Sequence, residues 1–240
     1  MSRLARPWAV VPVKRFAEAK SRLAGVLIAS ERAIVAQTMF LHVLEVLSGS
    51  ASLAGVVVVT EDEDAARPAR AKGALVISRK DELGLNGAIA AAFDTLRGMG
   101  AASAFAVSSD LPLLCAADVD GITRALGAVG AVLVEARADG GTNVFGTCPP
   151  GAIAPAYGTH SFRRHLAILR VEGFEPEALA PAGLTLDLDT PDDISTLVRI
   201  GGGTLTHQLL AKLGFVGGEQ ARRTNPLPLK PEALHQETQF

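Results

Sequence analysis

Short apolar runs alternate with amphipathic stretches along most of the chain. Four of these runs are continuous and rich in Val and Ala, as is typical of strands buried on both faces: residues 8–13, 55–60, 103–108 and 131–135. A shorter run at 74–78 follows a charged stretch that predicts a short helix. Each run is separated from the next by a helical segment. This βαβ order predicts an α/β fold with a mixed, mainly parallel sheet flanked by helices.

The helices between these strands are expected to begin at polar residues. Ser30 precedes apolar positions at helical spacing that continue to residue 47, and Asn86 precedes a similar pattern that continues to residue 97. Asp118 is expected to open a further helix. We therefore predict that these three side chains lie at helix N-termini.

The pattern changes after residue 136. Residues 137–157 contain Gly, Pro and a short strand at 143–147, and they contain no convincing helix. A helix rich in Arg and His is expected over 159–171, and a final strand over 184–188. The sequence Thr190-Pro191-Asp192-Asp193 predicts a helix start, with a capping hydroxyl, proline at the first position and acid in the first turn.

Residues 201–240 differ from the rest of the chain. Three glycines at 201–203 precede one amphipathic helix over 204–215, and 224–231 is rich in proline. We predict one domain over residues 1–200. Residues 201–240 then form a C-terminal extension that is partly extended or packs on a neighbouring subunit, unless they are a solvated tail with no role.

Composition and charge narrow the possible functions. The 240 residues include 23 Lys plus Arg and 25 Asp plus Glu, a net charge of −2, whereas general binders of nucleic acid or anionic membranes carry a clear basic excess. With 48 % hydrophobic residues the chain can build a substantial core. No apolar stretch approaches the roughly 20 residues of a membrane span, and the two cysteines form no C-x-x-C pair. We expect a soluble cytoplasmic protein that binds neither nucleic acid nor membranes.

The loop after the first strand concentrates positive charge. It carries four cationic side chains, Lys14, Arg15, Lys20 and Arg22, against one acid, Glu18. In an open α/β sheet, ligands bind at the carboxyl ends of the strands, where this loop must lie. Lys supplies point charge and Arg a bidentate fork, so the loop suits a polyphosphate unless it is an ordinary solvated surface. Neither G-x-x-x-x-G-K-[ST] nor G-x-G-x-x-G follows this strand, which argues against P-loop NTPases and dinucleotide-dependent dehydrogenases.

Three carboxylates stand at other strand ends. Asp110 follows an apolar strand and is fixed by Pro112, and Asp187 and Asp189 alternate along the last expected strand, which would place them on one face about 7 Å apart. A carboxylate beside a triphosphate would repel it without a divalent cation, and Mg²⁺ favours carboxylates plus phosphate oxygens. We predict that the three hold Mg²⁺. Alternatively, Asp110 caps the next turn and Asp189 merely precedes a helix.

Two glycine-bearing segments predict a second, smaller anion site. Residues 139–143 (DGGTN) and 157–165 (YGTHSFRRH) allow close backbone approach, and the latter leads into a helix N-terminus. Thr142 and Ser161 are the candidate contacts for a small acidic substrate. His160 and His165 are five residues apart, which fits no metal spacing on a helix, so each is expected to be a polar helix residue or an anion contact. Asn86 either caps its helix or offers its backbone to a nucleobase.

These segments occur in a familiar order. They are Pro12-Val13-Lys14 with Ala19-Lys20-Ser21-Arg22-Leu23, Ser109-Asp110-Leu111-Pro112, Asp139-Gly140-Gly141-Thr142-Asn143, Gly158-x-x-Ser161-Phe162 and Asp187-x-Asp189-Thr190-Pro191. Over roughly residues 7–200 the chain resembles the 2-phospho-L-lactate, phosphoenolpyruvate or 3-phospho-D-glycerate guanylyltransferases of coenzyme F-420 biosynthesis. Each motif is weak alone, but five in order are specific.

The resemblance implies a nucleotidyltransferase fold of the glycosyltransferase-A type that transfers GMP from GTP to a phosphorylated three-carbon acid. It implies the following roles: Asp110, Asp187 and Asp189 for Mg²⁺, Lys14, Lys20, Arg22 and Asn86 for the nucleotide, Lys20, Arg22 and Asp110 for catalysis, and Thr142, Gly158 and Ser161 for the acceptor. It also implies a possible homodimer. Tyr157 stands where the family often has Phe, and Thr159 and His160 lie inside the acceptor loop, so the identity of the acceptor stays open. The alternatives are a nucleotidyltransferase for CTP or another acceptor, and a GTP-sensing module without catalysis.

Overall fold

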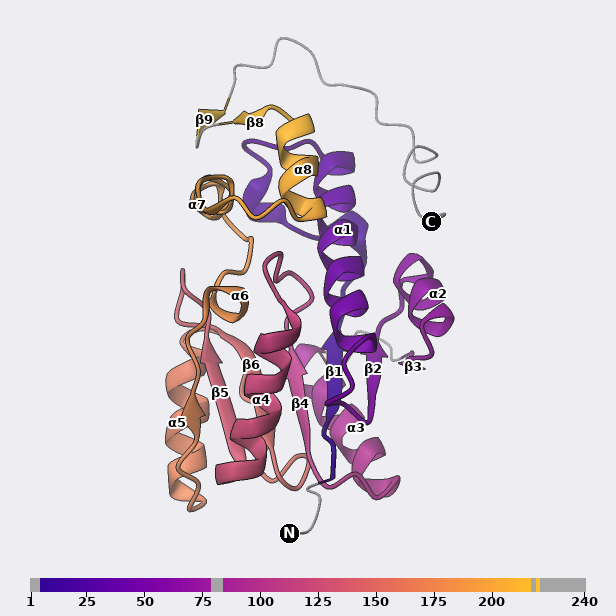
Figure 1. Cartoon of the computed structure of the whole chain (residues 1–240), viewed down its shortest axis with the longest axis vertical. Helices are drawn as coiled ribbons and strands as arrows, with labels where there is room; N and C mark the ends of the chain where they lie inside the picture. Colours follow the sequence, from indigo (N-terminus) through magenta and orange to yellow (C-terminus); the bar gives the residue numbers. More distant parts are fainter. Residues whose placement is uncertain (1–4, 79–83, 217–218, 221–240) are drawn as a thin grey trace.

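Seven strands form one twisted sheet at the centre of the molecule (Figure 1). The computed structural model describes residues 5–78, 84–216 and 219–220. The strand order is β3-β2-β1-β4-β6-β5-β7. The strands are β1 (Trp8–Pro12), β2 (Gly55–Val59), β3 (Leu75–Ile77), β4 (Ala104–Val107), β5 (Ala131–Glu135), β6 (Thr142–Thr147) and β7 (Glu177–Ala178). Only β6 runs antiparallel to its neighbours, β4 and β5, so the prediction of a mixed, mainly parallel sheet is confirmed.

Helices cover both faces of the sheet. Their bounds are α1 (Ala29–Ser48), α2 (Glu63–Ala71), α3 (Gly84–Gly98), α4 (Ala116–Val129), α5 (Ser161–Val171), α6 (Ala182–Thr185), α7 (Pro191–Ile200) and α8 (Leu205–Lys212). Apolar residues of α1, α2 and α4 bury one face, while α3 and α5 bury the other. Figure 1 shows α1 and α4 in front of the strands. The continuous apolar strands seen in the sequence thus result from burial on both sides.

The cationic loop folds into two short 3-10 helices at the carboxyl end of β1. These are η1 (Phe16–Glu18) and η2 (Ser21–Leu23), and the buried side chains of Phe16 and Leu23 anchor them to the core. Lys20 stands between them in the left-handed region, with φ of 56°. Residues other than glycine rarely adopt this backbone conformation, and here the Lys20 side chain is buried.

Two expected helix caps are wrong. Ser30 lies inside α1, whose N-terminus is satisfied by the Glu31 carboxylate accepting from the Ile28 N–H at 3.2 Å. Asn86 lies inside α3, and its side-chain amide donates to the Tyr157 carbonyl. Asp118 lies in the first turn of α4, where its carboxylate accepts from the Cys115 N–H. The start of α7 is confirmed, with Thr190 and Asp193 capping each other.

The strand expected over 184–188 is also wrong. Its first residues belong to α6, and 186–189 run extended without joining the sheet. The alternating leucines predicted a strand, but Leu184 is buried in the core under α1 and α4, and Leu186 and Leu188 are buried in a separate cluster. Moreover, β7 already pairs with the edge of β5 that such a strand would need.

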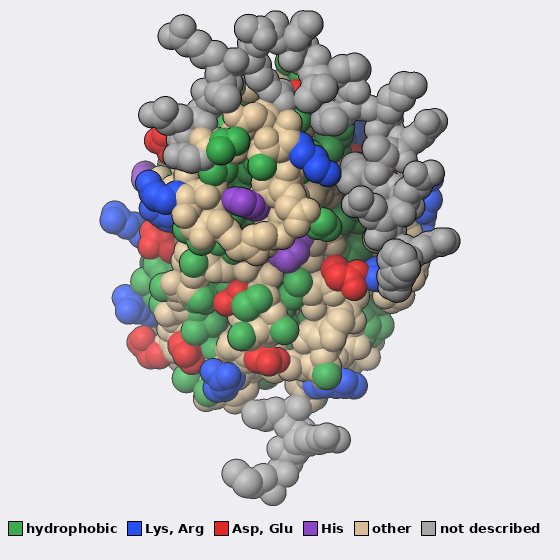
Figure 2. All heavy atoms as spheres, turned by 45° about the horizontal axis from the view of Figure 1, so that its top comes forward, with side chains coloured by type: hydrophobic (Ala, Val, Ile, Leu, Met, Phe, Trp, Pro, Cys, Tyr) green, Lys and Arg blue, Asp and Glu red, His purple; other side chains and the backbone are tan. Residues whose placement is uncertain are grey.

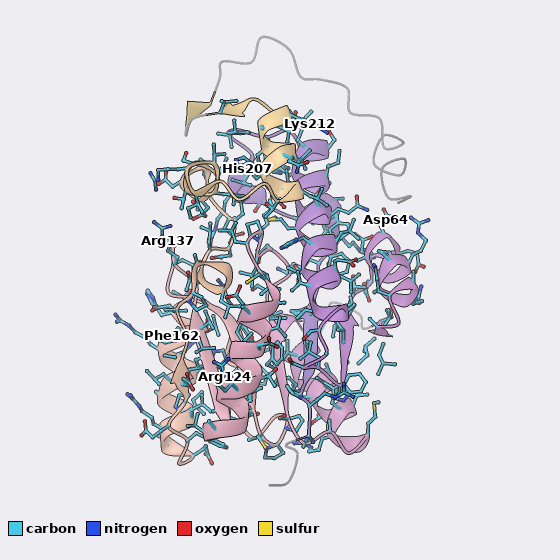
Figure 3. The ribbon with its side chains drawn as sticks, viewed as in Figure 1. Asp64, Arg124, Arg137, Phe162, His207 and Lys212 are labelled. Carbon is cyan, nitrogen blue, oxygen red and sulfur yellow. The ribbon has the colours of Figure 1, made fainter. Side chains whose placement is uncertain are left out.

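A third apolar cluster lies beyond the sheet, at the top of Figure 1. Here α8, marked by His207 and Lys212 in Figure 3, packs against the long α1. Leu210, Leu213 and Phe215 share this cluster with Leu23 and Leu188. Part of the predicted extension therefore packs on the chain's own α1, followed by β8 (Phe215–Val216) and β9 (Glu219–Gln220). The proline-rich stretch 224–231 lies outside the described residues, and the boundary at residue 200 stays a prediction.

The described surface matches the charge balance of the sequence. On the face shown in Figure 2, Lys and Arg side chains alternate with Asp and Glu around the described part. Within the described residues, no helix has the length and apolar content needed to cross a bilayer.

Candidate active site

A cavity of about 540 Å³ opens at the carboxyl ends of the central strands. It is walled by the ends of β1 and β4, the loop after β5, the segment before α5 and the extended residues 186–189. Its lining includes these predicted site residues: Arg22, Asp110, Thr142, Gly158, Ser161, Asp187 and Asp189. The sequence motifs, although far apart in the chain, thus meet around one space.

Lys20 is buried between two of the carboxylates. Its Nζ donates to Asp110 at 2.5 Å and to Asp189 at 2.7 Å, and its side chain is only 7 % exposed. Burial alone would lower the pKa of Lys20, but the charges and hydrogen bonds of Asp110 and Asp189 outweigh it and raise the pKa to about 12. The ammonium is therefore a fixed positive charge among the acids.

Arg22 joins two sides of the cavity. One guanidinium nitrogen lies 3.3 Å from Asp139 and 3.7 Å from Asp189. Asp139 also accepts from the backbone N–H of Gly141 and so shapes the loop before β6. Lys14 is exposed, and its charge contributes to lowering the pKa of Asp189. The cationic loop therefore faces the carboxylates, as predicted.

Asp110, Asp187 and Asp189 offer a compact set of oxygen ligands. One oxygen from each lies within 4.8 Å of the others. They converge although 186–189 is no strand of the sheet, because Leu186 and Leu188 are buried while the Asp side chains turn to the cavity. Hard carboxylate oxygens in this number fit Mg²⁺, so the residues present suit the predicted ion.

The carboxylates differ in acidity. Burial, and then the charges of Asp110 and Asp189, raise the pKa of Asp187 to about 7. Burial would also raise the pKa of Asp189, but Lys20, Arg22 and Lys14 outweigh it and lower that pKa. Asp187 therefore titrates near neutral pH, and a bound cation would compete with its proton.

The opposite wall is neutral and hydrogen-bonded. Thr142, at the start of β6, lies with its Oγ1 2.9 Å from the Ser161 Oγ at the start of α5, and both residues are buried. Gly158 has φ of 127°, a conformation that strains any residue with a side chain, so the position favours glycine. This wall brings together the three predicted acceptor contacts.

Asn86 reaches the same wall from α3. Its Oδ1 accepts from the Tyr157 N–H at 2.7 Å, and its Nδ2 donates to the Tyr157 carbonyl at 3.2 Å. These two hydrogen bonds fix the backbone next to Gly158. The role of Asn86 in nucleotide binding stays a prediction.

Sequence reasoning missed two positioning residues. Asn143 was seen only as part of a glycine-bearing motif, but its buried amide donates to the carbonyls of Leu184 and Thr185 and, at 3.4 Å, to Asp187. Asp139, likewise seen only in that motif, pairs with Arg22. Nothing in the local pattern reveals these partners, which lie about 40 and more than 100 residues away in the chain.

Comparison with known proteins gives a consistent picture. The family model described as "Guanylyl transferase CofC like" matches residues 8–225. The chain is 34 % identical over 226 residues to a phosphoenolpyruvate guanylyltransferase of Conexibacter woesei, covering 91 % of this chain and 98 % of that one. It is 34 % identical to a 3-phospho-D-glycerate guanylyltransferase of Phenylobacterium zucineum, with 85 % and 95 % covered. It is 31 % identical to a 2-phospho-L-lactate guanylyltransferase of Methanothermobacter thermautotrophicus, with 86 % and 91 % covered.

Solved structures support the fold. A putative nucleotide-diphospho-sugar transferase from Desulfovibrio desulfuricans G20 superposes with a TM-score of 0.72 at 18 % identity, covering 87 % of this chain and 95 % of that one. This similarity establishes the nucleotidyltransferase type of α/β fold that the sequence predicted, and it says nothing about the substrate.

Proposed function

The chain belongs to the family of CofC-like guanylyl transferases, and we propose that it transfers GMP from GTP to a phosphorylated three-carbon acid and releases diphosphate. The observation that carries the proposal is the meeting of two unlike walls in one cavity. Lys20 and Arg22 face Asp110 and Asp189 on one side, and the Thr142–Ser161 pair stands on the other. The first wall suits a triphosphate and the second a small anion.

The proposed reaction is an in-line displacement at the α-phosphorus of GTP. An oxygen of the acceptor's phosphate forms a bond to that phosphorus, the bond to the oxygen bridging to the β-phosphorus breaks, and diphosphate leaves with the electron pair. The acceptor phosphate is already anionic, so no general base is required. The protein's contribution is therefore positioning and charge neutralisation.

The cationic loop supplies the neutralisation. Lys14, Lys20 and Arg22 would hold the triphosphate, and Lys20 and Arg22 would offset the charge that grows on diphosphate as it leaves. Without nucleotide, Lys20 is held by Asp110 and Asp189. We expect its ammonium to turn toward the phosphates once a divalent cation neutralises these acids.

Asp110, Asp187 and Asp189 would hold Mg²⁺, which supplies further charge neutralisation to the phosphates when bound. Asp110 and Asp189 already pair with the Lys20 ammonium, whereas burial raises the pKa of Asp187 to about 7, so the cation would compete with a proton there.

The acceptor is open among three acids. Relatives named for phosphoenolpyruvate, 3-phospho-D-glycerate and 2-phospho-L-lactate differ little in identity to this chain, between 31 % and 34 %. A role in coenzyme F-420 biosynthesis, location in the cytoplasm and a homodimeric state likewise belong to the proposal.

The test is diphosphate release from GTP with each acid in turn. We expect release with GTP and at least one of the three acids, no release without acceptor, and loss of release in excess EDTA that Mg²⁺ restores. ATP, CTP and UTP serve as matched controls. Preference for CTP would indicate another nucleotidyltransferase, and GTP binding without release under any acceptor would indicate a sensing module and overturn the proposal.

A further inference from the structure

His165 is a fully buried imidazole directly behind the acceptor wall. It lies on α5, stacks on Phe145 with ring centres 4.5 Å apart, and meets the edge of Tyr157 at 4.9 Å. Both ring nitrogens are engaged. Nε2 lies 2.8 Å from the backbone nitrogen of Ala156, and Nδ1 lies 3.0 Å from the Thr142 Oγ1.

The bond to Ala156 determines where the imidazole carries its hydrogen. A backbone N–H can only donate, so Nε2 must be the unprotonated acceptor. In a neutral ring the hydrogen then lies on Nδ1. Burial, and then the charge of Arg164, lower the pKa of His165 to about 4, so the ring is neutral at physiological pH. His165 therefore donates from Nδ1 to the Thr142 hydroxyl.

Counting hydrogens along the chain His165–Thr142–Ser161 gives a definite result. Nδ1–H and the two hydroxyls supply three hydrogens, and the two internal bonds use two of them. Among the described residues the two hydroxyls have no further hydrogen-bond partner. One O–H therefore remains to donate, whichever hydroxyl carries it.

The opposite tautomer would give the opposite wall. With the hydrogen on Nε2, the Thr142 hydroxyl would donate to Nδ1 and the Ser161 hydroxyl would donate to Thr142. Both hydroxyl hydrogens would be used internally, and the pair would present only lone pairs to the cavity. A phosphate or carboxylate, which only accepts, would then be repelled.

We propose that His165 is a positioning residue that makes the Thr142–Ser161 pair a hydrogen-bond donor toward an anionic oxygen of the acceptor acid. This inference rests on the proposed function, because it takes the ligand at this wall to be the phospho-acid. The same bond to Ala156 also fixes the segment that leads to Gly158. Tyr157, between these two residues, is held by Asn86. His165 thus sets both the geometry and the polarity of the wall without touching the ligand.

Three variants separate the contributions of His165. In His165→Asn, the amide N–H replaces Nδ1–H and keeps the donor to Thr142. In His165→Gln, the amide oxygen replaces Nε2 and keeps the acceptor for Ala156, but Thr142 loses its donor. His165→Phe keeps the ring stack and neither bond. Melting temperatures measured in parallel show how much of any effect is loss of folding.

In His165→Gln and His165→Phe the Thr142–Ser161 pair still has one free O–H, but no donor behind Thr142 orients it toward the cavity. We therefore expect the acceptor KM to rise about five- to tenfold in these two variants, part of the loss expected for one hydrogen bond to a charged group. In His165→Asn the acceptor KM should stay within about threefold of wild type, while the KM for GTP changes little in all three. A purely structural role would make the acceptor KM follow the melting temperature instead, and that result would overturn the proposal.

A direct measurement does not depend on activity. In ¹⁵N-histidine-labelled wild-type protein, long-range proton–nitrogen spectra should show that His165 carries its hydrogen on Nδ1. The His165 signals are assigned by their loss in His165→Asn or, if that variant does not fold, by their proximity to Phe145. Phosphoenolpyruvate added as the probe should shift these signals and leave the tautomer unchanged. Hydrogen on Nε2 would overturn the inference. If wild type releases no diphosphate with any acid, the proposed function fails while the tautomer still tests this inference.

Discussion

The two walls of the cavity differ in charge and in how their side chains are held. The wall of Arg22 and the three Asp residues, with Lys20 buried behind it, brings charges of both signs to short range. The wall of Thr142 and Ser161 is neutral, buried and held by hydrogen bonds from behind. Under the proposed function, the charged wall would have to rearrange its ion pairs to admit a nucleotide and a cation, whereas the neutral wall would keep the hydrogen bonds that it already has.

This difference indicates a division of work. Charge that develops on a leaving diphosphate is best met by full positive charges already placed in a partly buried site, where their interaction is strong. Discrimination among small acids is better served by fixed donors, because an unmatched group leaves a buried hydroxyl unsatisfied. Substitutions in the charged wall should therefore act mainly on turnover, and those in the neutral wall on acceptor binding.

The largest effect is expected from Asp110→Ala. The variant removes a carboxylate from the cation site and one partner of Lys20, so turnover should fall by about two to four orders of magnitude while the fold persists. Steady-state diphosphate release, with circular dichroism to check the fold, measures it. Asp120→Ala, an exposed carboxylate on α4, is the matched control. Near-normal turnover in folded Asp110→Ala would exclude the metal role.

Arg22→Ala tests the link between the walls, because Arg22 pairs with both Asp139 and Asp189. Its guanidinium is 61 % exposed, so we expect a smaller loss, about 10- to 100-fold in kcat/KM for GTP. Arg67→Ala is the control, since Arg67 pairs with Asp64 on α2, and Figure 3 shows Asp64 on the side of the molecule away from Phe162 of α5. Equal kinetics in the two variants would contradict a role for Arg22.

Ser161→Ala tests the neutral wall. Loss of one hydroxyl should raise the acceptor KM about five- to tenfold and leave the KM for GTP nearly unchanged. Initial rates with each substrate varied separately decide this. Ser195→Ala on α7, where the hydroxyl bonds only to the Pro191 carbonyl within its own helix, is the control. A matching rise in the KM for GTP would show that the walls do not divide the work.

The smallest effect concerns the stability of the charged wall. The pKa of Asp187 in the folded protein, about 7, lies above the usual value near 3.9, so its protonated form favours folding. The contribution of Asp187 to the free energy of unfolding is full below about pH 4 and is lost as pH rises through 7. Asp187→Asn cannot ionise, so its melting temperature relative to wild type should rise by several degrees between pH 5 and pH 8 in EDTA. Thermal unfolding that shows a constant difference would contradict this.

Much of the fold could be predicted from local pattern. The strands at 8–13, 55–60, 103–108 and 131–135 appear where their apolar runs predicted them, because burial on both faces leaves a signal within each segment. The prediction of a strand over 184–188 was wrong because alternating leucines give the same pattern whether they enter a sheet or a separate cluster. The cap at Ser30 was wrong because Glu31 accepts from the Ile28 N–H instead, and the cap at Asn86 was wrong because its amide bonds to the Tyr157 backbone.

The site shows the same division. The residue types of the cationic loop and of the three carboxylates predicted a shared cavity, because parallel strands end at one edge of a sheet. The pairing of Asn143 with Asp187, of Arg22 with Asp139 and of His165 with Ala156 could not be predicted. Each depends on the angle between elements that no local sequence specifies.

The sequence by itself determined the order of elements, the charges and the hydroxyls available for chemistry, because these follow from residue type and short-range periodicity. Tertiary structure alone decided which acid keeps a proton, which ammonium lies among the carboxylates and which imidazole nitrogen carries its hydrogen. Those properties depend on desolvation and on neighbours brought within about 3 Å by packing of distant segments.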